Sequence, residues 1–217
     1  MNENVKKPIT TQALNRMSYY IQQLRLLKEQ GVETVSAPKI ATLLHLNEVV
    51  VRKDFASVYV NKGKPKTGFI VEDLLDSMES ILGYNNADEA VIIGAGSLAH
   101  AIMSHEGFKD YGLKIVAAFD TNPDIVGTEI NGVRVLPTDT ISNLCRRMQI
   151  HIGIITVPPS QAQIVCDQLV AGGIQGIWNF APVHLSVPDY ILVRNENLAA
   201  SLAALSNHLK QAMRTSD

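Results

Sequence analysis

Cysteine is scarce in this sequence, and its histidines are scattered. The 217 residues include only two cysteines, Cys145 and Cys166, which form no CxxC pair and suggest no disulfide framework. The six histidines show none of the close spacings that bind metal ions. We therefore expect a cytoplasmic protein without structural disulfides and without a metal site.

Long hydrophobic runs are also missing. No apolar stretch approaches the roughly 18 residues of a membrane span, and residues 1–16 contain no apolar signal-peptide region. We expect no membrane partner. Apolar residues nevertheless make up 46% of the chain and charged residues 18%, which favours a packed core over disorder. A chain of this length forms one large domain or two small ones.

Charge is nearly balanced overall but unevenly distributed. Residues 1–70 carry 11 lysines and arginines against 5 acidic residues, whereas residues 71–217 carry 8 against 16. A basic front part indicates contact with a polyanion. Two ordinary solvated surfaces would give the same totals, so charge alone leaves both interpretations open.

Apolar residues at helical spacing predict three helices in the basic part. The first covers 14–30 and stops at Gly31. The second is short and is capped by Ser36, and the third covers 48–58 and is capped by Asn47. Because a turn of a few residues joins the last two, they form a helix-turn-helix. The buried face of the second helix is expected to contain Ile40, Leu43 and Leu44.

A β-hairpin is predicted next, in the stretch VYVNKGKPKTGFIVEDLL. Alternating apolar residues flank a basic tip that contains glycine and proline, which is typical of the wing of a winged helix. Lysines at this tip can neutralise DNA phosphates, and a solubilising loop is the alternative. The candidate DNA contacts are Arg16, Ser36, Arg52, Lys53, Lys62, Lys64, Lys66 and Thr67.

A dinucleotide site is predicted in the stretch EAVIIGAGSLAHAIM. Gly94, Gly96 and Ala99 fit G-x-G-x-x-G/A between a buried strand and a helix. The second strand, LKIVAAFD, ends at Asp120, and an acidic side chain there accepts hydrogen bonds from ribose hydroxyls and repels a 2′-phosphate. NAD(H) is therefore favoured over NADP(H). A strand-end or helix-capping aspartate is the structural alternative for Asp120.

The remaining sequence alternates strands and helices, as a Rossmann-type doubly wound parallel sheet requires. Ser160 is expected to cap the helix that follows TVPP. Ligands bind at the carboxyl ends of such strands, where TVPP and NFAP lie. The candidate cofactor-binding residues are Gly94, Ala95, Gly96, Ser97, Leu98, Ala99, Asp120, Thr156, Val157, Pro158, Asn179, Phe180, Ala181 and Pro182.

Three segments are expected: a winged-helix domain over 1–84, a Rossmann domain over 88–195 and a C-terminal helix over 196–217. Leucines repeat at helical spacing in that helix, with alanines between them. It packs either on its own domain or on a partner subunit. The candidate interface residues of this helix are Leu198, Leu202 and Leu205.

The order of these motifs resembles that of the redox-sensing transcriptional repressor Rex family over nearly the whole chain. The matching segments include VRKDFASV, GKPKTGF, IIGAGSLAHAI, AAFDTNPDIVG and AGGIQGIWNFAP. The resemblance implies a homodimer with a swapped C-terminal helix, which binds a palindromic double-stranded DNA operator. It also implies that NADH releases the protein from DNA, whereas the oxidised cofactor permits binding.

The sequence departs from the family pattern at several positions. Ser97 and Ala99 stand where the family usually has Asn and Gly, and His105 stands where it usually has Tyr. Asn197 replaces the Asp that, with that Tyr, joins the arginine at Arg16 in a network that couples the cofactor to the DNA-binding domain. The sequence therefore leaves Arg16 without this carboxylate partner.

Two other functions are weighed against a repressor. An NAD-dependent oxidoreductase needs a substrate domain and a positioned acid or base, and about 130 residues after the linker leave little room for them. A CoA-type nucleotide-binding subunit would also carry a glycine turn but would leave the basic helix-turn-helix unexplained. We therefore expect a DNA-binding regulator rather than an enzyme.

Overall fold

A computed structural model describes residues 9–59, 68–84, 88–105, 107 and 112–214. The chain divides into two compact units, Met1–Asn86 and Ala87–Asp217, which are described separately below. Among the residues that the model describes, no helix has the length and apolar character needed to cross a membrane.

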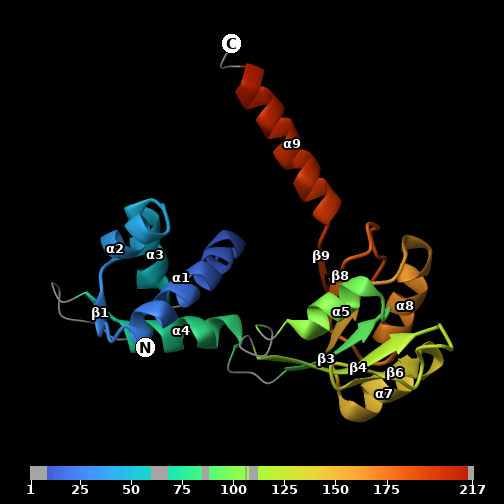
Figure 1. The fold of residues 1–217 in the computed structure, drawn as a ribbon. Coiled ribbons are helices and arrows are strands. Elements are labelled where there is room, and N and C mark those ends of the chain that lie inside the picture. Colours follow the sequence, from blue (N-terminus) through green and yellow to red (C-terminus); the bar gives the residue numbers. More distant parts are fainter. Residues whose placement is uncertain (1–8, 60–67, 85–87, 106, 108–111, 215–217) are drawn as a thin grey trace. The chain divides into compact units, whose positions relative to one another are not determined.

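The described residues of the first unit form four helices and a two-stranded sheet, and Figure 1 shows their arrangement within this unit. Its elements are α1 (Thr11–Glu29), β1 (Thr34–Val35), α2 (Ala37–Leu43), α3 (Glu48–Val58), β2 (Phe69–Ile70) and α4 (Val71–Leu82). The side chains of Ser36 and Asn47 accept hydrogen bonds from Lys39 N at 3.3 Å and from Val49 N at 2.9 Å. These bonds satisfy backbone donors at the starts of α2 and α3 and confirm the predicted caps.

The predicted wing is only partly described. Val58 ends α3 and Tyr59 is the C-terminal cap of that helix, so the expected first wing strand does not include them. Strand β2 instead pairs antiparallel with β1, which the sequence did not predict. The basic tip, residues 60–67, lies outside the described residues.

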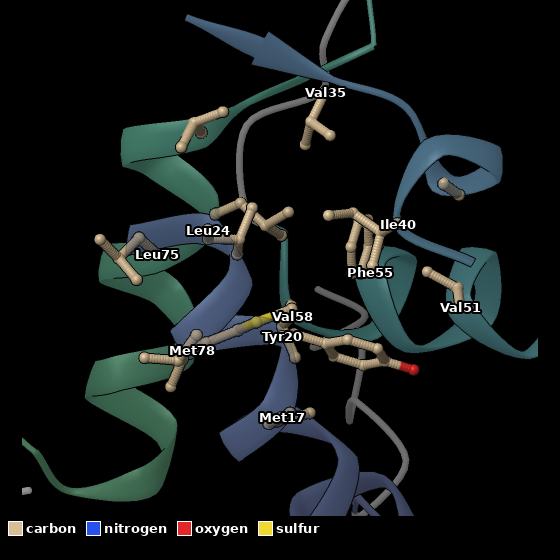
Figure 2. Close-up of a cluster of buried hydrophobic side chains, with 14 of the residues drawn as sticks. Met17, Tyr20, Leu24, Val35, Ile40, Val51, Phe55, Val58, Leu75 and Met78 are labelled. Atoms are coloured by element: carbon tan, nitrogen blue, oxygen red, sulfur yellow. The ribbon is translucent and has the colours of Figure 1, made fainter. Parts of the chain in front are cut away.

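The core of the first unit is built from the inner faces of α1, α3 and α4, to which α2 and β1 add a few residues. Figure 2 shows Tyr20 of α1 close to Phe55 of α3, and their ring centroids lie 5.3 Å apart in an edge-to-face arrangement. Phe55 packs in the same manner against Phe69, at 5.1 Å. The predicted burial of Leu43 is wrong, because this side chain is 43% exposed. The buried face of α2 is centred on Ala37, Ile40 and Ala41, and Leu43 points away from it.

The second unit contains a seven-stranded sheet in the order β5-β6-β4-β3-β7-β8-β9. Only β5 is antiparallel to its neighbour; the other six strands pair in parallel. In chain order these six strands follow 3-2-1-4-5-6, the arrangement of a dinucleotide-binding Rossmann fold. The strands are β3 (Asp88–Ile93), β4 (Leu113–Asp120), β5 (Glu129–Ile130), β6 (Val133–Pro137), β7 (Ile152–Ile155), β8 (Gly176–Asn179) and β9 (Leu192–Asn195).

Helices cover both faces of this sheet (Figure 1). Along β3, Val91 and Ile93 pack in the cluster formed with α7 and α8, whereas Ala90 and Ile92 pack in the cluster formed with α5. The order of strands reverses between β3 and β7, so the carboxyl ends of these two strands form the switch point where ligands bind. The helical elements are α5 (Ser97–Ser104), η1 (Thr138–Thr140), α7 (Ile141–Met148), α8 (Pro159–Ala171) and α9 (Leu198–Arg214).

Both cysteines lie in the core beneath α7 and α8. Cys145 and Cys166 are fully buried, as free thiols. Loss of hydration raises the pKa of each thiol to about 11. Redox chemistry at these thiols is therefore disfavoured, because the reactive species is the thiolate.

We predict that a thiol-specific reagent labels neither cysteine in the native protein at neutral pH and labels both after unfolding. Because the folded-state pKa values lie above the usual thiol value, both thiols favour the folded state below about pH 8.5. This contribution is lost as the pH rises toward 11. Denaturant titrations between pH 8 and 11 should show this loss, and rapid labelling of the native protein would contradict the account.

Candidate dinucleotide cleft and DNA-binding surface

The turn after β3 requires glycine at its first position. Gly94 has a φ of +91°, and a β-carbon placed there would lie 2.9 Å from the carbonyl oxygen of Thr156. Gly96 differs, since its φ is −80° and an added β-carbon would meet nothing within 4 Å. The first glycine is thus required by the fold, whereas the second keeps an open space in front of the turn.

Two side chains hold the turn from opposite sides. The carboxylate of Asp120, at the end of β4, accepts hydrogen bonds from Ala95 N at 2.7 Å and from Asn122 N at 2.8 Å. The hydroxyl of Thr156, at the end of β7, lies 2.9 Å from Ile93 O and 2.7 Å from Gly94 O. The carboxyl ends of three neighbouring strands are therefore fixed against one another at the switch point.

The turn leads into the uncapped amino terminus of α5. Gly96 is the N-cap of this helix, and no side chain hydrogen bonds to the first turn. The first backbone N–H groups of a helix point outward and carry partial positive charge, so they bind phosphate. Ala99 is fully buried beneath them, as its place in the motif requires. This geometry suits the pyrophosphate of a dinucleotide.

A cleft of about 380 Å³ opens in front of this turn. Six of the predicted cofactor residues line it: Gly94, Gly96, Asp120, Thr156, Val157 and Pro158. Ala95, Leu98 and Ala99 lie behind its wall in the core with α5, and Ser97 is exposed at the start of α5. The open space at Gly96 and the uncapped helix fit a bound dinucleotide.

Sequence analysis missed half of the lining. The other residues are Thr121, Thr138, Gln161, Ile164, Val165 and Gln168. Ile164 is 55% exposed and gives the cleft an apolar wall. Four of these residues, Gln161, Ile164, Val165 and Gln168, belong to α8. They could have been predicted from Pro158, which follows the carboxyl end of a strand, because the next helix must border the same cleft.

That helix begins at Pro159 with Pro158 as its N-cap, so the predicted cap at Ser160 is wrong.

The NFAP segment lies at a different pocket. Ala181 and Pro182 line a hollow of about 170 Å³ together with Asn197. Asn179 is buried, and its amide donates to Ala181 O, Val183 O and Asn195 Oδ1 at 2.9–3.1 Å. Phe180 packs on Trp178, with 4.6 Å between ring centroids. The structure gives Asn179 the role of a buried anchor for this loop and does not bring these four residues into the larger cleft.

The DNA-binding candidates of the helix-turn-helix are exposed on its outer surface. Ser36, Arg52 and Lys53 are all exposed, and the first turn of α3 brings Glu48 into an ion pair with Arg52. His45 lies in the turn between the helices with a φ of +51°. Lys62, Lys64, Lys66 and Thr67 lie outside the described residues and stay predictions.

Arg16 has a carboxylate partner that sequence analysis did not identify. Its guanidinium forms two hydrogen bonds with Asp54, at 2.7 and 3.0 Å, and Tyr20 adds a third to the same carboxylate at 2.8 Å. The side chain of Arg16 is only 25% exposed, and the ion pair uses two of its five N–H donors. Direct contact between Arg16 and DNA stays a prediction.

The interface candidates lie at the ends of helices and along α9. His105 follows α5 as its C-cap, and its Nδ1 accepts a hydrogen bond from Gly107 N at 3.0 Å. The side chain of Asn197 accepts a hydrogen bond from Ala200 N at 2.9 Å, just before Leu198 begins α9. Leu202 and Leu205 are exposed, together with Leu209 and Met213.

Comparisons with known proteins agree with this two-part organisation. Residues 9–56 match the family model "Putative DNA-binding protein N-terminus", and residues 85–183 match the model "CoA binding domain". The redox-sensing transcriptional repressor Rex of Porphyromonas gingivalis is 38% identical over 91% of this chain and 90% of its own. This chain belongs to the Rex family. The Rex protein of Bacteroides fragilis is 37% identical over 95% of this chain and 93% of its own.

Solved structures extend the agreement to three dimensions. The crystal structure of RSP in complex with β-NAD+ and operator DNA has a TM-score of 0.89 and 30% identity to this Rex-family chain, covering 97% of each. A structure of RSP in complex with β-NADH has a TM-score of 0.83 and 31% identity, covering 97% of this chain and 99% of RSP. The predicted fold class, a winged helix-turn-helix followed by a Rossmann-type sheet, is confirmed.

We expect the two glycines of the turn to have different roles: Gly94 is needed for folding and Gly96 for dinucleotide binding. We predict that Gly96→Ala leaves the thermal unfolding temperature nearly unchanged but weakens dinucleotide binding about tenfold or more, because the new methyl group enters the open space. Gly94→Ala should instead destabilise the fold by about 1–3 kcal/mol through its positive φ and the clash with Thr156. Calorimetric titration and thermal unfolding of both variants test this, and equal dinucleotide affinity of Gly96→Ala and wild type would contradict it.

Proposed function

We propose that this Rex-family protein is a transcriptional repressor that binds operator DNA through its first unit and senses the NADH/NAD+ ratio through its second. The observation that carries the proposal is the presence, in one chain, of a helix-turn-helix that exposes Arg52 and Lys53 and a Rossmann cleft with an uncapped helix. The relative RSP has been seen with β-NADH and with β-NAD+ plus operator DNA. We place the protein in the cytoplasm, where it would act on DNA.

The cleft is suited to NAD(H) rather than NADP(H). The carboxylate of Asp120 already accepts two backbone N–H bonds but retains lone pairs for ribose hydroxyls. Its negative charge would repel a 2′-phosphate. The first N–H groups of α5 would receive the pyrophosphate, and Ile164 offers an apolar surface to the adenine ring.

An enzymatic function has little support in the cleft. Among the described residues that line it, Asp120 is the one titratable side chain, and its two oxygens already accept hydrogen bonds from Ala95 N in the turn and from Asn122 N. General acid–base catalysis needs a positioned proton donor or acceptor. A CoA-type function would use the second unit alone, whereas the relatives of this chain match both units.

The proposed repressor acts as a homodimer through α9. Leu202, Leu205 and Leu209 form an apolar stripe along α9 and are 60–67% exposed, and the other α9 side chains whose burial the structure describes are also exposed. A helix of this kind gains stability when a second surface covers its apolar face. A dimer also explains how one protein can read two half-sites of a palindrome.

Leu205→Glu should convert the dimer into a monomer and abolish tight binding to a palindromic site, because it places a charge within the apolar stripe. Asn207→Glu adds the same charge on the opposite face of α9 and should leave the dimer intact. Light scattering after size-exclusion chromatography measures both. A wild-type monomer, or a Leu205→Glu dimer, would contradict the role of α9.

The proposal is tested with DNA selected by the wild-type protein from a random-sequence pool. Fluorescence anisotropy should show affinity for this duplex that NADH lowers about tenfold or more, which corresponds to about 1.4 kcal/mol of preference for the DNA-free state. NAD+ should have little effect, and NADPH should act only weakly because of Asp120. Equal effects of NADH and NAD+ would refute redox sensing, and the absence of any selected sequence would refute specific DNA binding.

A further inference from the structure

The helix-turn-helix contains a carboxylate in an unusual environment. The side chain of Asp54 on α3 is only 8% exposed. It is the one charged side chain in the buried class among the residues that the structure describes. Removing a carboxylate from water is costly unless partners compensate for its charge. Neither the packing of the core nor direct contact with DNA explains its presence.

Two residues of α1, one helical turn apart, compensate for this charge. Arg16 donates two hydrogen bonds to the two oxygens of Asp54, at 2.7 and 3.0 Å, and Tyr20 donates one at 2.8 Å. Tyr20 is fully buried, and burial together with the neighbouring carboxylate raises the pKa of its hydroxyl, which therefore remains a donor. The three bonds connect α1 directly to α3.

A bidentate pair between arginine and carboxylate has a defined plane and direction. Arg52 and Lys53 directly precede Asp54 and are exposed. Successive helical residues are about 100° apart around the axis, so fixing Asp54 also fixes where Arg52 and Lys53 point. The contacts of Val51 and Phe55 with the core are apolar and permit small rotations more readily.

We propose that Asp54 is a positioning residue for DNA recognition, which holds α3 at the angle where its exposed side chains match the bases of the operator. The inference rests on the proposed function. Buried ion pairs contribute little net stability compared with apolar residues of similar size. The cluster of Arg16, Tyr20 and Asp54 instead adds orientation, because its three hydrogen bonds are directional and connect α3 to α1.

The same unit offers a matched control. Arg25 of α1 binds Glu79 of α4, with Nε and Nη2 at 3.1 and 2.8 Å from one carboxylate oxygen. The Glu79 side chain is 17% exposed. This pair also connects α1 to another helix through an arginine and a carboxylate, but that helix is α4 and not α3. Its loss would change stability without turning Arg52 and Lys53.

The experiment compares Asp54→Asn, Tyr20→Phe and Glu79→Gln in the full-length chain. The readout is the ratio of affinity for the selected duplex to affinity for a random duplex of the same length at fixed salt. Asp54→Asn should lower this ratio about tenfold, with affinity for random DNA unchanged or slightly higher because one negative charge is lost. Tyr20→Phe, which keeps the ion pair, should lower the ratio about threefold. Glu79→Gln should keep the wild-type ratio.

Each outcome decides a different question. A folded Asp54→Asn variant with the wild-type ratio overturns the positioning role, and so does a reduction of equal size in Glu79→Gln. If Asp54→Asn does not fold, by circular dichroism, Tyr20→Phe decides: an unchanged ratio overturns the proposal. A wild-type protein that does not distinguish the two duplexes refutes the proposed function itself.

Discussion

The structure of the second unit depends on how tightly the turn between β3 and α5 is held. Gly94 can occupy its left-handed conformation against the backbone of Thr156 only because it lacks a side chain. Asp120 and Thr156 then fix the turn from the two neighbouring strands. As a result, the uncapped amino terminus of α5 borders an open cleft, and backbone N–H groups at such a terminus bind phosphate. Binding to such a pre-formed site is not opposed by the entropy of ordering a loop.

The first unit has a different requirement, which is to present the exposed Arg52 and Lys53 of α3 at a fixed angle. Its core is apolar and packs α3 on α1, but the directional contact between the two helices is the cluster of Arg16, Tyr20 and Asp54. Arg16 thus has a carboxylate partner, Asp54, within its own unit. A sensor built from two such rigid units can respond to its ligand by moving them as bodies.

The fold could be predicted from the sequence because hydrophobic periodicity, helix caps and the glycine motif all agree. Local signals were enough for Ser36, Asn47 and Gly94. Local signals failed where contacts between distant segments determine the structure, as in the pairing of β2 with β1. The ion pair of Arg16 joins residues 38 positions apart, and no local pattern reveals it. The prediction for Asn179 failed for the same reason. Its position at a strand end suggested contact with a ligand, whereas its amide hydrogen bonds to Ala181 and Asn195 of the protein itself.

In a repressor of this kind the dinucleotide cleft and the DNA-binding surface are energetically coupled, and such coupling is reciprocal. The most direct measurement is the affinity for NADH with and without a saturating amount of the selected duplex. The account predicts that DNA weakens NADH binding by the same factor by which NADH weakens DNA binding. Identical NADH affinity in the two conditions would contradict it.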